Sequence, residues 1–330
     1  MSDPKPSLDQ LLDQLQQAEA VGDPFKQGIT LNNLGSYYKD HRDIPHALDY
    51  FRKALEFFTV LADIEKRATV LNNLGGTFLD ARQYQLALEH FAMALGTYGS
   101  LNQPFGQGMT LNNMGGVHQL LRRYEESRKQ FILAASFFRS AQTPAWEAQA
   151  LENLAAAEAG LGNPRSAIES YGRALEIWQR LDQHERQAMI LNRIASMHSA
   201  AGDNERAMDL HNRALSLAGK AHNGALQAST HASLGKILME TGNANGARAE
   251  FQATLLMCEQ LGDKRGQANA LLNLGKLEIS FGQELVRSAV TLFQEIGDKT
   301  GEEAANLLLP SLPEEPHAEH SVSVAKDKLA

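Results

Sequence analysis

The chain has 330 residues, of which 43% are hydrophobic and 7% aromatic, and its formal net charge is −8 at pH 7. This acidic balance argues against a general nucleic-acid binder, which needs a basic stripe to displace counterions from phosphates. No apolar run approaches the roughly 20 residues that a membrane span requires. The polar start MSDPKPSLDQ also lacks the apolar core of a signal peptide. We therefore expect a soluble, cytoplasmic protein with no nucleic-acid or membrane partner.

The pentapeptide LNNLG at residues 31–35 returns every forty residues along the chain. A second pattern, A-x3-F-x2-A, begins twelve residues after its glycine, as at Ala47, Phe51 and Ala54. A fixed internal period of this size indicates a repeat architecture rather than two ordinary domains. The later copies read LNNLG at 71, LNNMG at 111, LENLA at 151, LNRIA at 191, HASLG at 231 and LLNLG at 271.

Each copy predicts a pair of helices. Leu71, Leu74 and Phe78 are spaced by three and four residues, which places them on one face of a helix. The second pattern has the same spacing on a second helix. Gly75 is small where the two helices must approach, and Phe91 is expected to fill the space beside it. Such a helical hairpin can bury its apolar face only against neighbouring repeats.

These landmarks resemble those of the tetratricopeptide repeat family, in a longer form with a forty-residue period. The matching residues are Leu71, Leu74-Gly75, Phe78 and Ala87-Phe91-Ala94, in the family's order of a bulky residue, L-G, an aromatic and A-x3-F-x2-A. The resemblance extends over roughly residues 8 to 309. It implies an all-α, right-handed superhelical solenoid of helical hairpins.

The ends of the chain depart from the regular period. LDQLLDQLQQAEA at 8–20 lies forty residues before a second-type helix, which predicts a capping half-repeat. The sequence at 262–275 returns imperfectly at 297–310, only 35 residues later, so the seventh repeat is shortened. We expect an N-terminal segment with a capping helix at 1–24, seven repeats at 25–299, a C-terminal capping helix at 300–309 and a disordered tail at 310–330.

The sequence lacks the motifs of phosphate loops, dinucleotide sites, nucleophile elbows and HExxH metal sites. The eleven histidines are scattered, and His211 stands where other repeats have an aromatic, so we expect it to be packed. The single cysteine, Cys258, excludes an intrachain disulfide and indicates a buried thiol in a reducing compartment. We predict no catalytic residue, no metal site and no cofactor.

Asparagines repeat in the two slots after the leading leucine. A residue two positions past that leucine points about 200° away from it on the helix, toward the concave groove that first helices line in a solenoid. A carboxamide there can donate to and accept from the backbone of an extended peptide. We predict this role for the second slot, as the resemblance also implies, and hydrogen bonds between repeats for the first slot, beginning with Asn32. The predicted peptide-binding asparagines are Asn33, Asn73, Asn113, Asn153 and Asn273.

A basic strip follows the same face in the C-terminal half, formed by Arg193, Lys236 and Lys276. It either favours an acidic peptide or is a solvated edge. The carboxylate clamp known in the resembling family is not matched, because the slot for one of its lysines holds Asn or Glu here. Chaperone C-terminal tails are therefore not the expected ligand.

These features predict a non-catalytic scaffold or adaptor that binds a protein or an extended peptide in its groove. The alternative is a peptide-responsive sensor or regulator that acts through a separate effector protein. Only residues 1–24 and 310–330 lie outside the regular repeats, too few for an effector domain within this chain.

Overall fold

The computed structural model describes residues 6–277 and 282–309. Over these ranges the chain is all α-helical, which confirms the predicted fold class. The predicted tail at 310–330 lies outside the described residues. The helices are α1 (Leu8–Val21), α2 (Pro24–Asp40), α3 (Ile44–Val60), α4 (Ile64–Asp80), α5 (Tyr84–Ser100), α6 (Pro104–Leu120), α7 (Tyr124–Ser140), α8 (Pro144–Gly160), α9 (Pro164–Arg180), α10 (His184–Ala200), α11 (Asn204–Lys220), α12 (Gly224–Glu240), α13 (Ala244–Leu261), α14 (Lys264–Leu277), α15 (Gly282–Glu295) and α16 (Lys299–Asn306).

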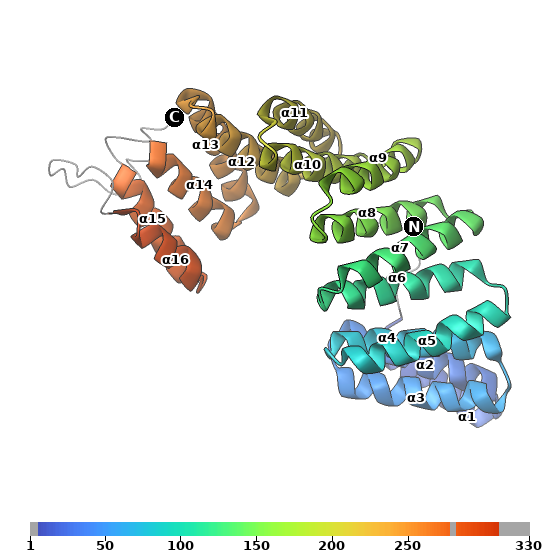
Figure 1. Cartoon of the computed structure of the whole chain (residues 1–330). Helices are drawn as coiled ribbons and strands as arrows, with labels where there is room; N and C mark the ends of the chain where they lie inside the picture. The colour runs from blue at the N-terminus through green and yellow to red at the C-terminus, as the bar shows by residue number, and fades with distance from the viewer. Residues whose placement is uncertain (1–5, 278–281, 310–330) are drawn as a thin grey trace. The chain divides into compact units, whose positions relative to one another are not determined.

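The chain forms two compact units, Met1–Ile177 and Trp178–Ala330, and the division falls inside α9. In the first unit α2 pairs with α3, α4 with α5 and α6 with α7, while α1 packs on α2 and α8 on α7. In the second unit α10 pairs with α11, α12 with α13 and α14 with α15, and α16 packs on α15. Successive helices therefore stack as hairpins within each unit (Figure 1).

Short turns join most of the described helices, and one residue in each of these turns has a left-handed backbone. Gly162 and Gly202 supply this conformation, with φ of 77° and 80°. Arg42 and Ala62 adopt it without glycine, at φ of 61° and 53°, which costs an L-residue roughly 1–2 kcal/mol. An aspartate then caps many of the next helices; Asp63, for example, accepts from the backbone N–H of Lys66 at 2.9 Å. The chain thus reverses direction at nearly equal intervals.

Four hairpin cores among the described residues are built from a glycine on the first helix and an aromatic ring on the second. A Cβ added to Gly75 would lie 2.6 Å from the ring of Phe91, which is fully buried. This confirms the predicted close contact between the paired helices. The same arrangement recurs at Gly35 with Phe51, Gly115 with Phe131 and Gly235 with Phe251.

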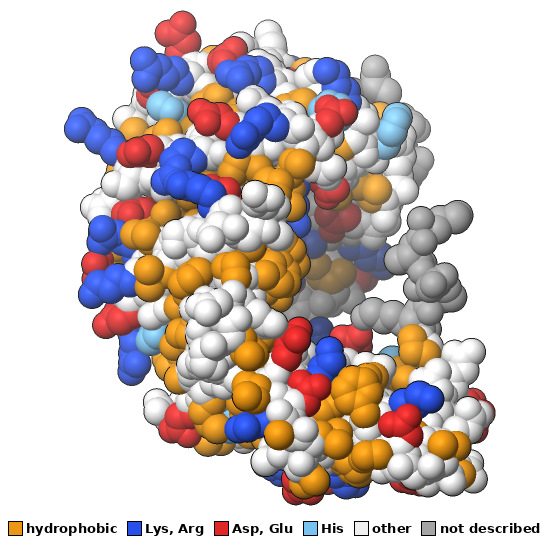
Figure 2. All heavy atoms as spheres, turned by 90° about the vertical axis from the view of Figure 1, so that its right-hand side faces the viewer, with side chains coloured by type: hydrophobic (Ala, Val, Ile, Leu, Met, Phe, Trp, Pro, Cys, Tyr) orange, Lys and Arg blue, Asp and Glu red, His pale blue; other side chains and the backbone are white. Residues whose placement is uncertain are grey.

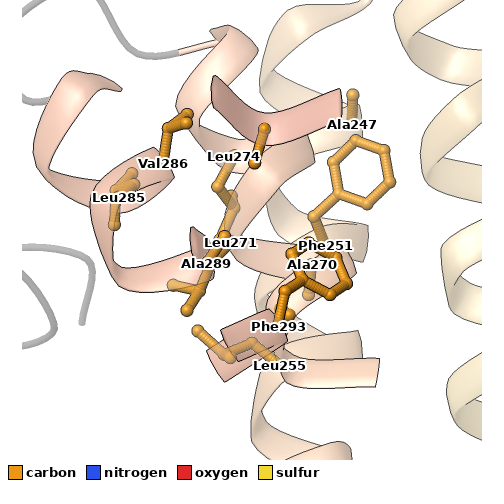
Figure 3. Close-up of a cluster of buried hydrophobic side chains, with 12 residues drawn as sticks. Ala247, Phe251, Leu255, Ala270, Leu271, Leu274, Leu285, Val286, Ala289 and Phe293 are labelled. Atoms are coloured by element: carbon orange, nitrogen blue, oxygen red, sulfur yellow. The ribbon is translucent and has the colours of Figure 1, made fainter. Parts of the chain in front are cut away.

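The two ends of the helical array differ from the middle. Leu11 of α1 is buried and Leu15 packs against the cluster that contains Phe51. At the other end α14, α15 and α16 share one buried cluster, to which Leu271, Phe293 and Ala305 belong. Val286 takes the place of the aromatic beside Gly275, and Phe293 closes the terminal cluster with Leu271 and Ala289 (Figure 3).

Candidate functional site

In the first unit the asparagines of the second slot hydrogen-bond to those of the first slot in the preceding repeat. We call this series of hydrogen bonds the asparagine ladder. The Nδ2 of Asn73 donates to the Oδ1 of Asn32 at 2.9 Å, and Asn153 donates in the same way to Asn112 at 2.9 Å. Between them, Asn113 donates to Asn72 at 3.3 Å. The prediction that the first slot links neighbouring repeats is therefore confirmed.

The asparagines of the second slot therefore use part of their side-chain amide for contacts between repeats. Asn73, Asn113 and Asn153 each give one N–H to the preceding repeat. Their carbonyl oxygens accept no hydrogen bond from a described residue, so an acceptor remains for a ligand at each position. Asn33 has no asparagine repeat before it and is exposed. This sharing was not visible in the sequence, because the partners lie 41 residues apart on different helices.

Asn32 and Asn33 provide a matched pair for testing the link between repeats. Asn32→Ala should lower the free energy of unfolding by about 0.5–1.5 kcal/mol, because the Asn73 amide loses its acceptor. Asn33→Ala should leave stability unchanged or raise it slightly, since Ala is the better helix former. Urea unfolding followed by circular dichroism measures both. Equal losses at the two positions would contradict the assigned ladder.

In the second unit the ladder becomes a buried network around His211. The Nδ2 of Asn192 donates to the Oγ1 of Thr230 at 2.7 Å. Its Oδ1 lies 2.8 Å from the Nδ1 of His211, which therefore carries the proton. His211 is only 1% exposed, and burial lowers its pKa to about 4. The imidazole is thus a neutral core group, as expected from its place in the repeat.

Three predicted binding residues meet at a cavity of about 450 Å³ between α12, α13 and α14. Lys236 and Lys276 are exposed, and neither forms an ion pair with a described residue. Asp263 also lines the cavity, but one carboxylate oxygen caps α14 by accepting from the backbone N–H of Gly266 at 3.0 Å. Asn273 completes the polar wall. This arrangement offers cations and a carboxamide to a bound ligand.

Asn273 differs from the asparagines of the first unit in having no ladder partner. The position that would accept its N–H, one repeat earlier, is Ala232. Within the part of the chain that the structure describes, both the donor and the acceptor of Asn273 therefore remain available at the cavity. Arg193, the third predicted cation, is exposed on α10 and is not among the residues that line this cavity.

Cys258 lies in the wall of the same cavity. The thiol is 3% exposed, and burial raises its pKa, with the charge of Asp263 adding to the effect. It therefore remains a protonated thiol, which is a poor nucleophile and a poor metal ligand. The predicted buried thiol is confirmed.

Asn33 and Asn73 line two further cavities, both within the first unit. Asn33 lies with Leu11, Tyr37 and His41 at a cavity of about 480 Å³ beside α1. Asn73 lies at one of about 630 Å³ between α4 and α6. The structure thus brings Lys236, Asn273 and Lys276 together and places Asn33 and Asn73 at separate sites.

Among residues 6–277 and 282–309, no three histidine, cysteine or acidic side chains are grouped so as to hold a metal ion. In the same part of the chain no helix has the length and apolar character needed to cross a bilayer.

The helical hairpins and their forty-residue period define an all-α repeat protein. Residues 27–100, 106–171 and 146–220 match the family model of the tetratricopeptide repeat, and these segments cover more than half of the chain. The chain therefore belongs to the tetratricopeptide repeat family, as its sequence landmarks predict. A sequence search of curated proteins finds no match.

Several solved structures share the fold. Aspartyl phosphate phosphatase F from Bacillus subtilis aligns with a TM-score of 0.62 and 14% identity, over 96% of this chain and 79% of that one. The apo form of RapI aligns at 0.56 and 17% identity, over 78% and 92%. A Rap protein complexed with competence and sporulation factor aligns at 0.54 and 13% identity, over 100% and 83%. At these identities the likeness is one of fold.

Proposed function

We propose that this protein is a non-catalytic scaffold or adaptor that binds an extended, acidic peptide segment of a partner along the first helices of its repeats. We further propose that it acts in the cytoplasm, a reducing compartment of the kind that its single cysteine indicates. The proposed binding rests above all on the cavity between α12, α13 and α14, where Lys236, Asn273 and Lys276 converge from two successive repeats. The asparagines of the first unit and Arg193 extend the proposed surface within their own units.

The chemistry of the cavity suits a peptide. The ammonium groups of Lys236 and Lys276 form no ion pair with a described residue and attract carboxylates. The amide of Asn273, which forms no hydrogen bond with a described residue, can bond to a peptide backbone whatever its side chains. Small residues, among them Ala225, Ser229 and Ala232, border the cavity and leave room for a main chain. The contribution of each lysine is modest because both are exposed.

Replacing both lysines tests the proposal. We expect Lys236→Ala with Lys276→Ala to weaken binding of an acetylated, amidated Ala-Glu-Ala-Glu-Ala-Glu peptide about tenfold, from roughly 1 kcal/mol per lost contact or less. Fluorescence anisotropy of a labelled probe gives the Kd, and added salt should weaken wild-type binding. Lys220→Ala, an exposed lysine at the end of α11, is the control.

The same peptide with glutamine in place of each glutamate separates the effect of charge from that of side-chain shape. It should bind wild type weakly and respond little to the lysine substitutions. Equal binding of both peptides, or an equal loss with Lys220→Ala, would contradict the proposed role of these lysines. The thermal melting temperature should be unchanged in both the double variant and the Lys220→Ala control.

A peptide-responsive regulator is the second candidate. Its support is the shared fold with the Rap protein that was solved in complex with competence and sporulation factor. One similar structure is named as a phosphatase, but tetratricopeptide repeats generally serve as non-catalytic scaffolds. Small-angle scattering with and without the acidic probe discriminates the two, since a regulator should change conformation on binding and a scaffold should not.

A further inference from the structure

A second cavity, of about 630 Å³, lies wholly in the first unit and has a different lining. It is enclosed by the first half of α4, the end of α5, the turn that follows and the start of α6. Neither the lysines nor the other cations of the proposed acidic-peptide site belong to it. Its lining residues are Glu65, Thr69, Asn72, Asn73, Tyr98, Asn102, Gln103, Pro104, Phe105, Gly106, Met109 and Ala141.

Gly106 lines this cavity and lies directly against the ring of Tyr98. In other repeats a large side chain at the same position covers the aromatic residue of the preceding helix: Trp146 stacks on Phe138 at 5.8 Å, and Arg186 lies over Trp178 at 5.7 Å. A Cβ at Gly106 would collide with the ring of Tyr98. The equivalent positions hold Lys26, Lys66, Gly106, Trp146, Arg186, Leu226 and Gly266, and the second glycine, Gly266, lines the lysine cavity of the other unit.

One wall of the cavity is apolar and partly exposed. Phe105 is 40% exposed, yet it is held by edge and tilted contacts to Trp146 at 5.8 Å and Phe138 at 5.9 Å. Met109 lines the same wall. On the face shown in Figure 2, hydrophobic side chains gather in patches between charged ones. A fixed aromatic ring at a cavity mouth offers a surface for an aliphatic stem or a planar cation.

Glu65 is the one charged side chain among the described residues that line the cavity. It forms no ion pair with a described residue. The Oγ1 of Thr69 donates to the backbone carbonyl of Glu65 at 3.1 Å and accepts from the Tyr98 hydroxyl at 3.3 Å. Burial raises the pKa of Tyr98, and the Glu65 charge adds to this effect. The Glu65 side chain is exposed and lines the cavity, so its carboxylate can meet a cation that enters it.

We propose that this cavity is a subsite for a long basic side chain of a bound peptide, arginine in preference to lysine. The aliphatic stem lies along Phe105 and Met109, and the cationic end reaches Glu65. A guanidinium stacks on an aromatic ring and bonds to a carboxylate in one plane, which an ammonium does not. The free carbonyl oxygen of Asn73 is a further acceptor for its N–H groups.

The subsite deepens the proposed peptide binding but lies in the other unit, so single amino-acid probes test it independently of the acidic peptide. The probes are Nα-acetyl-arginine amide, Nα-acetyl-lysine amide and Nα-acetyl-norleucine amide, titrated calorimetrically into the full chain. We expect arginine to bind up to about fivefold more tightly than norleucine, from roughly 1 kcal/mol or less for the charge. Glu65→Gln should remove this preference.

Two further variants locate the binding. Glu56→Gln makes the same charge change at an exposed residue of α3 that does not line the cavity. This variant should keep the preference for arginine over norleucine. Trp178→Phe leaves Trp146 as the single tryptophan, and its contact with Phe105 should make its emission respond to the arginine probe. Equal affinities for arginine and norleucine, an unchanged preference in Glu65→Gln, or no binding of any probe at 10 mM would each overturn the subsite.

Discussion

Gly75→Leu should destabilise the protein by about 1–3 kcal/mol, because overpacking a filled core forces side chains and backbone to shift. An added Cβ would already lie 2.6 Å from the ring of Phe91, and Phe91 is fully buried between α4 and α5. The ring has no empty space into which it can retreat. Urea unfolding monitored by circular dichroism should show a lower midpoint with little change in slope.

Gly116→Leu is the matched control for this substitution. Gly116 lies on α6, and no atom stands within 4 Å of the position that its Cβ would occupy. Leucine there should stabilise the helix by up to about 1 kcal/mol through its better propensity. Combining Gly75→Leu with Phe91→Ala should cost less than the sum of the single changes, since the two residues share one volume. Additive costs, or equal effects at Gly75 and Gly116, would contradict the assigned contact.

The glycine–aromatic core was predictable because it depends on spacing within one hairpin. Leu71, Gly75 and Phe78 share a helix face by periodicity alone, and Phe91 follows at a fixed interval on the next helix. Each repeat presents the same pattern, so the prediction was reinforced along the chain. The period likewise predicted the succession of helical hairpins.

The asparagine ladder was only half predictable, because it depends on the register between first helices of successive repeats. The sequence indicated that one slot would face a neighbour, but not that its partner would be the second slot of the next repeat. The three-residue network of Asn192, His211 and Thr230 was missed for the same reason. Its members are 19 and 38 residues apart, on three helices.

The cavities had a signal in the sequence that periodicity of apolar residues does not reveal. The third residue of the first helix in each repeat is glycine at 106 and 266, whereas the other repeats have larger side chains there. Tyr98 packs against Gly106 and Cys258 against Gly266, and each of these glycines lines a cavity. The linings then differ in charge, with Glu65 at one cavity and Lys236 and Lys276 at the other. Departures from the repeat consensus thus mark candidate sites more clearly than the consensus itself.

His211 should make the second unit acid-labile. Its folded-state pKa is about 4 against an ordinary 6.5, because burial disfavours the charged imidazolium. Between pH 4 and pH 6.5 His211 binds a proton in the unfolded chain but not in the folded chain. The contribution of neutral His211 to the free energy of unfolding is therefore complete above about pH 6.5 and is lost as the pH falls toward 4. The full effect of such a shift is about 3 kcal/mol.

His211→Phe isolates this contribution. Phenylalanine occupies the same position at Phe51, Phe91 and Phe131, so the side chain fits the repeat. At pH 7 the variant should be as stable as wild type or up to about 1 kcal/mol less stable, since Asn192 loses a donor.

At pH 4.5 we expect the order of stability to reverse, with the variant more stable by roughly 1–2 kcal/mol, because its residue 211 takes up no proton on unfolding. Urea unfolding of both proteins at several pH values between 4.5 and 7.5 measures the difference. His118, whose pKa is also lowered by burial, remains in both chains and cancels in the comparison. Parallel pH profiles for variant and wild type would show that His211 takes up its proton in the folded protein as readily as in the unfolded one. The network with Asn192 would then have to accommodate an imidazolium.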